Sequence, residues 1–214
     1  HVPLEFYNRD IDDLIIDRFR FGRNGVNIKR HKETCEKMIA PNLPEVHVGV
    51  LAKYIENADE AYLSLKEALV HSAAAINAKV NIHWISAEDV ENCKRGVGRY
   101  FEDLHALIVP GGFDCRGVEG KIRGVKWARE HKLPFLGICL GLQCAVIEFV
   151  RTVLTQDANS IEFDPNTPNP VVHFVAGQEE LTEKSANMRL GAYDCELTKD
   201  SLAHDLYRKK LISE

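Results

Sequence analysis

The 214-residue sequence lacks the features that mark membrane proteins and nucleic-acid-binding proteins. No stretch reaches the roughly 18 consecutive apolar residues that a membrane-spanning helix needs. The formal net charge is −5, so the chain has no basic excess that would attract nucleic acid or an anionic membrane. The first residues, His1 to Glu5, contain no apolar core of a signal peptide. We therefore expect no nucleic-acid partner and no membrane partner.

Cysteine pairs and metal-ligand clusters are also missing. The six cysteines are scattered without a Cys-x-x-Cys pair, which favours a reduced, cytoplasmic protein with free thiols over a disulfide framework. No cluster has the spacing of metal ligands, so no metal site is predicted. The segment from Gly117 to Lys121 lacks the spacing and the following Ser or Thr of a phosphate-binding loop, which argues against nucleotide hydrolysis.

The order of the apolar segments predicts an α/β fold. Strands are expected at Val46–Leu51, Lys79–Ile85, Leu104–Val109 and Leu133–Ile138. Helices are expected at Ile11–Phe19, Glu33–Ile39, Asp59–Ala75, Val118–His131 and Cys144–Val150. This alternation predicts a doubly wound, mostly parallel sheet with helices on both faces, as in flavodoxin-like folds. Further strands are expected at an edge or in an antiparallel extension, over Val171–Ala176 and Met188–Leu197.

Cys139 lies at the apex of a predicted strand, turn and helix. Its neighbours Gly137 and Gly141 permit a strained turn that holds the sulfur clear of the sheet. A helix N-terminus behind the sulfur favours the thiolate, and the N–H of Leu140 can donate to an oxyanion that forms beside it. A lone cysteine is more often an inert core residue, but this context favours a nucleophile.

Pro110-Gly111-Gly112-Phe113 follows another predicted strand. Active sites of parallel sheets lie at the carboxyl ends of the strands, so we expect this segment beside Cys139. Gly112 could supply a second N–H to the oxyanion, although a Gly-Gly pair is also a common strand-ending turn. Gln143, one helical turn past the cysteine, is either a substrate ligand or a solvated helix residue.

None of the nine histidines stands where the base of a cysteine nucleophile is expected. His173 and His204 follow Cys139 in the sequence, but neither begins a His-x-Glu pair. Two other cysteines lie near Cys139 in the sequence without occupying a sharp turn. Cys144 fits a core position of a helix, and both Cys115 and Cys144 are interpreted as structural.

Several separated blocks resemble class I, triad-type glutamine amidotransferases and, more narrowly, the glutaminase domain of the CTP synthase family. The blocks are Pro110–Phe113, Arg116–Lys121, Lys126–Glu130, Gly137–Phe149, Ala158–Phe163 and Met188–Ala192. The resemblance implies the class I amidotransferase fold and a glutamine-hydrolysing ligase of pyrimidine nucleotide biosynthesis. Cys139 would form a thioester with L-glutamine, and the released ammonia would aminate UTP to CTP.

The same resemblance implies roles for particular residues. The N–H groups of Gly112 and Leu140 would form the oxyanion hole. An activation loop for GTP would contain Arg116, Gly117 and Glu119, although these residues also suit a charged turn that caps the next helix. The implied substrate-binding residues are Gly111, Gly112, Leu140, Gly141, Leu142, Gln143 and Glu162.

The resemblance also implies a domain organisation. Residues 1–45 would be the end of a synthetase domain with an interdomain linker, and residues 46–214 an amidotransferase domain without its C-terminal part. The chain does not begin with Met and stops before the family's later His-Pro-Glu pair, so we expect an excised piece. No cofactor is expected in this domain. ATP, Mg²⁺ and UTP would bind the absent synthetase domain, and the enzyme would be a homo-oligomer, a tetramer by resemblance.

Two alternatives remain open. The chain could be a catalytically incomplete binding or assembly module of the same family, since no base is visible. It could also be another hydrolase with a cysteine elbow on a similar sheet. Gln143 and the Ala158–Phe163 block argue against the latter.

Overall fold

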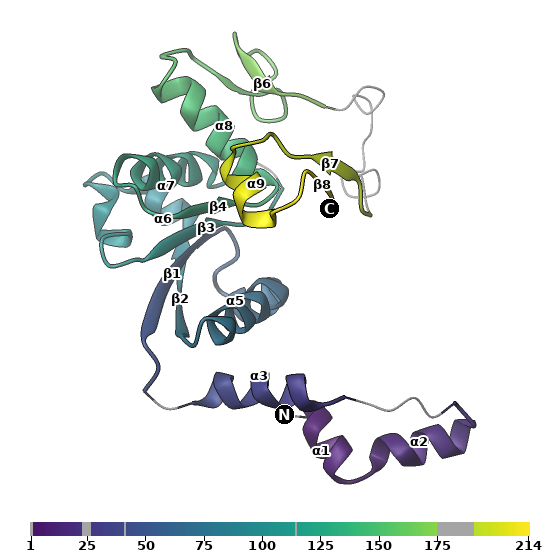
Figure 1. Cartoon of the computed structure of the whole chain (residues 1–214). Coiled ribbons are helices and arrows are strands. Elements are labelled where there is room, and N and C mark those ends of the chain that lie inside the picture. The colour runs from purple at the N-terminus through teal and green to yellow at the C-terminus, as the bar shows by residue number, and fades with distance from the viewer. Residues whose placement is uncertain (1, 23–26, 41, 114, 175–190) are drawn as a thin grey trace. The chain divides into compact units, whose positions relative to one another are not determined.

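The computed structural model describes residues 2–22, 27–40, 42–113, 115–174 and 191–214 (Figure 1). The chain separates into two compact units, residues 1–173 and 174–214, and each is described by itself. The first unit contains the main sheet and its helices. Within the described part of the chain, no helix is both long and apolar enough to cross a membrane.

The main sheet has four parallel strands in the order β2-β1-β3-β4. They are β1 (Glu45–Ala52), β2 (Lys79–Ser86), β3 (Ala106–Val109) and β4 (Phe135–Gly137). In the central strand, Val50 pairs with Trp84 of β2 and with Ile108 of β3. The predicted parallel α/β fold is confirmed. β4 begins at Phe135 rather than at Leu133, and the intervening Pro134 has no N–H for the strand ladder.

Helices cover both faces of the sheet, because successive side chains of a strand point to opposite faces. Val50 packs in one apolar cluster with Leu65 and Leu69 of α5 (Leu63–Ala75), whereas Leu51 belongs to the cluster on the other face. That second face is covered by α6 (Ala87–Asn92), α7 (Val118–Glu130) and α8 (Leu140–Thr152). Figure 1 shows α7 and α8 on one side of the sheet and α5 on the other.

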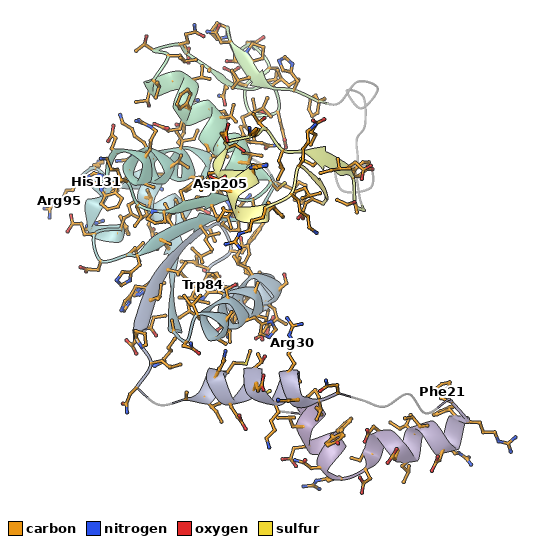
Figure 2. All side chains as sticks on the ribbon, viewed as in Figure 1. Phe21, Arg30, Trp84, Arg95, His131 and Asp205 are labelled. Carbon is orange, nitrogen blue, oxygen red and sulfur yellow. The ribbon has the colours of Figure 1, made fainter. Side chains whose placement is uncertain are left out.

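Tyr62 interrupts the helix that was predicted over Asp59–Ala75. The structure has a short α4 (Ala58–Ala61), then Tyr62 with φ −121° and ψ 29°, and then α5. The Tyr62 ring stacks on Trp84 of β2 with ring centroids 5.7 Å apart. Figure 2 labels Trp84. The prediction of one continuous helix was therefore wrong, and the ring packing accompanies the break.

The connection between β2 and β3 contains α6 and a short 3₁₀ helix, η1 (Val97–Tyr100), neither of which was predicted. α6 begins at Ser86, whose Oγ accepts a hydrogen bond from the Asp89 N–H at 3.1 Å. At its other end Arg123 of α7 donates to the carbonyls of Val90, Glu91 and Cys93. These contacts hold α6 against α7.

The N-terminal segment is helical. α2 (Ile11–Phe19) begins after Asp10 as predicted, but Asp10 has φ 53° and makes no capping hydrogen bond with its side chain. An unpredicted α1 (Val2–Asn8) precedes it. α3 (Lys29–Ile39) begins before the predicted Glu33, and α3 packs against α5.

Short strands follow α8. β5 (Asn159–Ser160) pairs in parallel with β6 (Pro170–Val172), so the strand predicted to start at Val171 ends at Val172. In the second unit, β7 (Asp194–Glu196) pairs antiparallel with β8 (Leu211–Ser213), and α9 (Leu202–Tyr207) lies between them in sequence. β7 agrees with part of the predicted strand Met188–Leu197, whose first three residues lie outside the described residues.

Candidate active site

Cys139 occupies a tight turn between β4 and α8. Its backbone has φ 53° and ψ −110°, and the N–H of Gly141 donates to the carbonyl of Ile138 at 2.9 Å. These values describe a β-turn close to type II′, with Cys139 at the position that favours glycine. A side chain in this conformation is strained. The cysteine is exposed, so its sulfur is accessible.

Two glycines allow this turn to sit against the end of β3. A β-carbon on Gly141 would overlap the carbonyl oxygen of Val109, and one on Gly137 would lie 2.6 Å from the carbonyl carbon of Gly141. The N–H of Ile138 donates to the same Val109 carbonyl at 2.9 Å. The close approach of backbone to backbone therefore fixes the height of the turn above the sheet.

The glycine pair after β3 lies beside this turn, as the parallel-sheet argument predicted. A β-carbon built on Gly111 would lie 3.4 Å from Cβ of Cys139 and 3.9 Å from its Sγ. One built on Gly112 would lie 3.6 Å from Cδ2 of Leu140. The structure thus brings together four of the residues singled out in the sequence, Gly111, Gly112, Cys139 and Leu140.

The N-terminus of α8 begins directly behind the sulfur. Leu140 is the first helical residue, and the first N–H groups of a helix have no acceptor within it. Their partial positive charge favours an anion at this position. Gln143 is half-buried one turn further on, and its backbone N–H donates to the Cys139 carbonyl at 3.1 Å. Leu142 is 58% exposed, on the outer side of the helix.

Glu162 follows β5, in a segment that packs beside α8. Its side chain is half-buried, and its backbone N–H donates to the Ser160 hydroxyl at 3.2 Å. Ser160 is itself 2% exposed. The buried Ser160 hydroxyl therefore fixes the backbone at Glu162.

The predicted activation loop is held by two ion pairs. The Arg116 guanidinium lies 3.0 Å from the Glu88 carboxylate of α6. Glu119, in the first turn of α7, accepts two hydrogen bonds from Arg151 of α8, at 2.8 and 2.9 Å. Gly117 is the N-cap of α7 and has φ 74°. This arrangement agrees with the interpretation as a charged turn at a helix start.

Two buried lysines near the glycine pair were missed in the sequence. Lys121 of α7 is 0% exposed, and a β-carbon on Gly112 would lie 3.5 Å from its Nζ. Lys53, just after β1, is 8% exposed and donates to the carbonyl of Phe113 at 3.0 Å. Burial lowers the pKa of Lys121. The helical spacing of Lys121 from Val118 and Val125, both buried, is the signal that placed it inward.

The other cysteines separate into two kinds. Cys144 is fully buried, as expected of a structural cysteine, and burial raises the pKa of its thiol to about 11. Cys115 is exposed, and its interpretation as a structural cysteine stays a prediction. No disulfide joins the six cysteines, because all are free.

The described histidines lie in other contacts. His47, on β1, has Nδ1 2.8 Å from Nε2 of His83, and its backbone N–H donates to His105. His173 Nε2 lies 2.7 Å from the Pro170 carbonyl, and His204 belongs to the second unit. Among the residues that the structure describes, no group of three or more His, Cys, Asp or Glu side chains is arranged to hold a metal.

The sheet and the turn place the protein among α/β proteins that hold one residue on a strained elbow between strand and helix. A comparison with known families narrows this class. Residues 58–210 match the family described as "Glutamine amidotransferase class-I", and the chain belongs to that family.

Relatives with described functions are similar over most or all of the chain. A CTP synthase of Caldanaerobacter subterraneus subsp. tengcongensis is 41% identical over 214 residues, 100% of this chain and 39% of the relative. The CTP synthase of Methanocaldococcus jannaschii is 44% identical over 218 residues, 100% of this chain and 40% of its own length. The chain thus spans about two fifths of these relatives.

A solved structure is similar as well. The glutaminase domain of Trypanosoma brucei CTPS, described with bound acivicin, matches with a TM-score of 0.71 and 31% identity. The match covers 79% of this chain and 65% of that one. It agrees with the parallel α/β architecture described above.

Proposed function

We propose that this chain is the glutaminase portion of a CTP synthase, with Cys139 as its nucleophile. The observation that carries the proposal is the elbow, in which a strained, exposed cysteine begins α8 with Gly111 against its β-carbon. The amidotransferase family and the CTP synthase relatives, at 41% and 44% identity, support the choice of substrate. The chain spans about two fifths of the length of those relatives. The CTP synthase activity of a longer polypeptide is therefore proposed here as well.

In the proposed reaction, the Cys139 thiolate attacks the side-chain carboxamide carbon of L-glutamine. The N–H groups of Gly112 and Leu140 donate to the oxyanion that develops on the carboxamide oxygen. The C–N bond breaks, the nitrogen takes up the proton that the thiol released, and ammonia leaves, which produces a glutamyl thioester. Water then attacks the thioester, releases glutamate and restores the thiol.

Gln143 and Glu162 are proposed to bind the polar head of glutamine, together with backbone groups of Gly111, Gly141 and Leu142. Both side chains are half-buried, and both come from segments at or beside the start of α8. A carboxylate suits the α-ammonium of the substrate, and an amide suits its α-carboxylate.

Residues 1–45 are proposed to be the end of a synthetase domain and the linker from it. ATP, Mg²⁺ and UTP would bind that synthetase domain, and ammonia would pass to it. Arg116 and Glu119 are proposed to respond to GTP. Because Arg116 lies 3.0 Å from Glu88, binding of a phosphate by Arg116 would require this ion pair to open. The six free thiols support a reducing, cytoplasmic setting.

Covalent labelling tests the proposal. A chloroketone analogue of glutamine needs a thiolate but no proton on its leaving group, so its reaction depends on the nucleophile and not on a general acid. In the full-length polypeptide, peptide mapping should find Cys139 modified first, and glutamine should protect it. A Cys115→Ser variant is the matched control, since Cys115 is also exposed. Labelling of Cys115 before Cys139, or labelling without protection by glutamine, contradicts the proposed nucleophile.

A further inference from the structure

In the described part of the chain, the ammonium of Lys121 is buried without a hydrogen-bond acceptor. Its side chain is 0% exposed, and among the described residues Nζ has no hydrogen-bond partner. Most buried polar groups are hydrogen-bonded, and a buried, unpaired ammonium destabilises a fold. Its neighbours on the inner face of α7, Val118, Ile122 and Val125, are all apolar and buried. An apolar residue would suit this position better if packing alone decided it.

The ammonium lies directly beside the proposed oxyanion hole. A β-carbon on Gly112 would be 3.5 Å from Lys121 Nζ, and one on the adjacent Gly111 would be 3.9 Å from Cys139 Sγ. Lys121 and Cys139 therefore both lie against the Gly111–Gly112 segment. Lys53 adds a second ammonium at the next residue, where it donates to the Phe113 carbonyl.

Three titratable groups of the described residues act on Lys121. They are Cys144 of α8, Lys53 after β1, and Cys139 itself. Burial raises the pKa of Cys144 to about 11, so at neutral pH this thiol carries no charge that could balance the ammonium. Lys53 has the same sign as Lys121. The remaining group of the three is Cys139, the proposed nucleophile.

We propose that Lys121 is a positioning residue whose ammonium stabilises negative charge at the Cys139 site, first on the thiolate and then on the oxyanion. The inference rests on the proposed function, because it takes Cys139 as the nucleophile. Lys121 forms and breaks no bond in this role. It acts through its electric field, because the lysine side chain is itself shielded from water.

The test is the pH profile of Cys139 alkylation by iodoacetamide in the full-length polypeptide, with mass mapping of the Cys139 peptide. Alkylation follows the thiolate, so its midpoint reports the charge on the sulfur. Lys121→Met should move this midpoint upward by about one pH unit, which slows alkylation near pH 7 by about tenfold. Lys121→Arg, which keeps the charge, should stay closer to the unchanged protein.

Lys126→Met is the matched control, because Lys126 lies on the same helix with its side chain 49% exposed. It should leave the midpoint unchanged. If Lys121→Met fails to fold, as judged by circular dichroism, Lys121→Gln carries the test with the same expected shift. An unshifted midpoint in the folded neutral variant overturns the role of Lys121 and leaves Cys139 as nucleophile. Preferential alkylation of another cysteine instead overturns the proposed function and this inference together.

Discussion

Arg151 of α8 forms a two-bond ion pair with Glu119 of α7, with Nη1 at 2.8 and 2.9 Å from the two carboxylate oxygens. The same guanidinium donates from Nε to the carbonyl of Ala158 at 2.7 Å. Ala158 is 0% exposed, whereas the Glu119 side chain is 51% exposed. One side chain thus joins the start of α7, the end of α8 and the segment that leads to Glu162.

The two contacts of Arg151 should contribute unequally to stability. Arg151→Met leaves the buried Ala158 carbonyl without its donor and should lower the free energy of unfolding by about 2 kcal/mol. Glu119→Gln removes only the charge of a side chain that is 51% exposed and should cost less than about 1 kcal/mol. Urea unfolding followed by circular dichroism measures both. Equal losses would show that the ion pair, rather than the buried carbonyl, is the important contact.

Gly141→Ala should disturb the turn that holds Cys139. Its new β-carbon would overlap the Val109 carbonyl oxygen, so the start of α8 must move away from β3. We expect a loss of about 1–3 kcal/mol in the free energy of unfolding and slower labelling of Cys139. Gly96→Ala is the control, because nothing lies within 4 Å of a β-carbon at Gly96. An unchanged labelling rate in Gly141→Ala would show that the elbow tolerates displacement.

Gly112→Pro should separate the two activities of the proposed enzyme. Proline removes the N–H that would donate a hydrogen bond to the oxyanion, so glutamine hydrolysis should fall by roughly 10²-fold. Synthesis of CTP from free ammonia should survive, since no thioester is needed. Gly112→Ala keeps the N–H, and its β-carbon meets only ordinary contacts of 3.5 and 3.6 Å, so it should hydrolyse glutamine at close to the normal rate. Equal loss of both activities in Gly112→Pro would indicate misfolding instead.

Cys144 should make the protein less stable in alkali. Burial raises the pKa of its thiol from 9.0 to about 11, so the folded state holds the proton over a pH range in which the unfolded chain has released it. The stability contribution is therefore present below pH 9 and declines as the pH rises, by about 1.4 kcal/mol at pH 10.

The measurement compares urea unfolding at pH 7 and pH 10 in the unchanged protein and in Cys144→Ala. The alanine variant should lack this part of the decline, while Cys195→Ala, at an exposed cysteine, should keep it. An identical decline in Cys144→Ala and in the unchanged protein would show that a group other than Cys144 causes the loss of stability in alkali.

The elbow was predictable because its signals are local. The glycines around Cys139 are adjacent to it in sequence, and the rule for parallel sheets placed Gly111 beside it without knowledge of side chains. The break at Tyr62 was not predictable, since the ring on which it stacks belongs to a distant strand. Lys121 was missed because a lysine is expected to be exposed, although its spacing from Val118 placed it on the buried face of α7.

The partners of Arg151 were likewise not predictable from the sequence. A pattern of apolar residues fixes which face of α8 is buried, but it does not say which carbonyl at the end of the helix lacks a donor. That information arises only when Ala158 is brought back against the helix, where Arg151 reaches it. The motif therefore predicted the elbow, whose residues are neighbours in the sequence. It did not predict contacts, such as that of Arg151 with Ala158, that form only after distant segments pack together.

The backbone of Cys139 also bears on how this protein would respond to selection for thermal stability. At φ 53° and ψ −110°, glycine would sit without strain where cysteine does not. A Cys139→Gly variant should therefore melt at a higher temperature than Cys139→Ala, while both lose the sulfur. A screen that scored heat resistance alone would favour replacement of this residue by glycine, and the more stable protein that it selected would lack the proposed nucleophile.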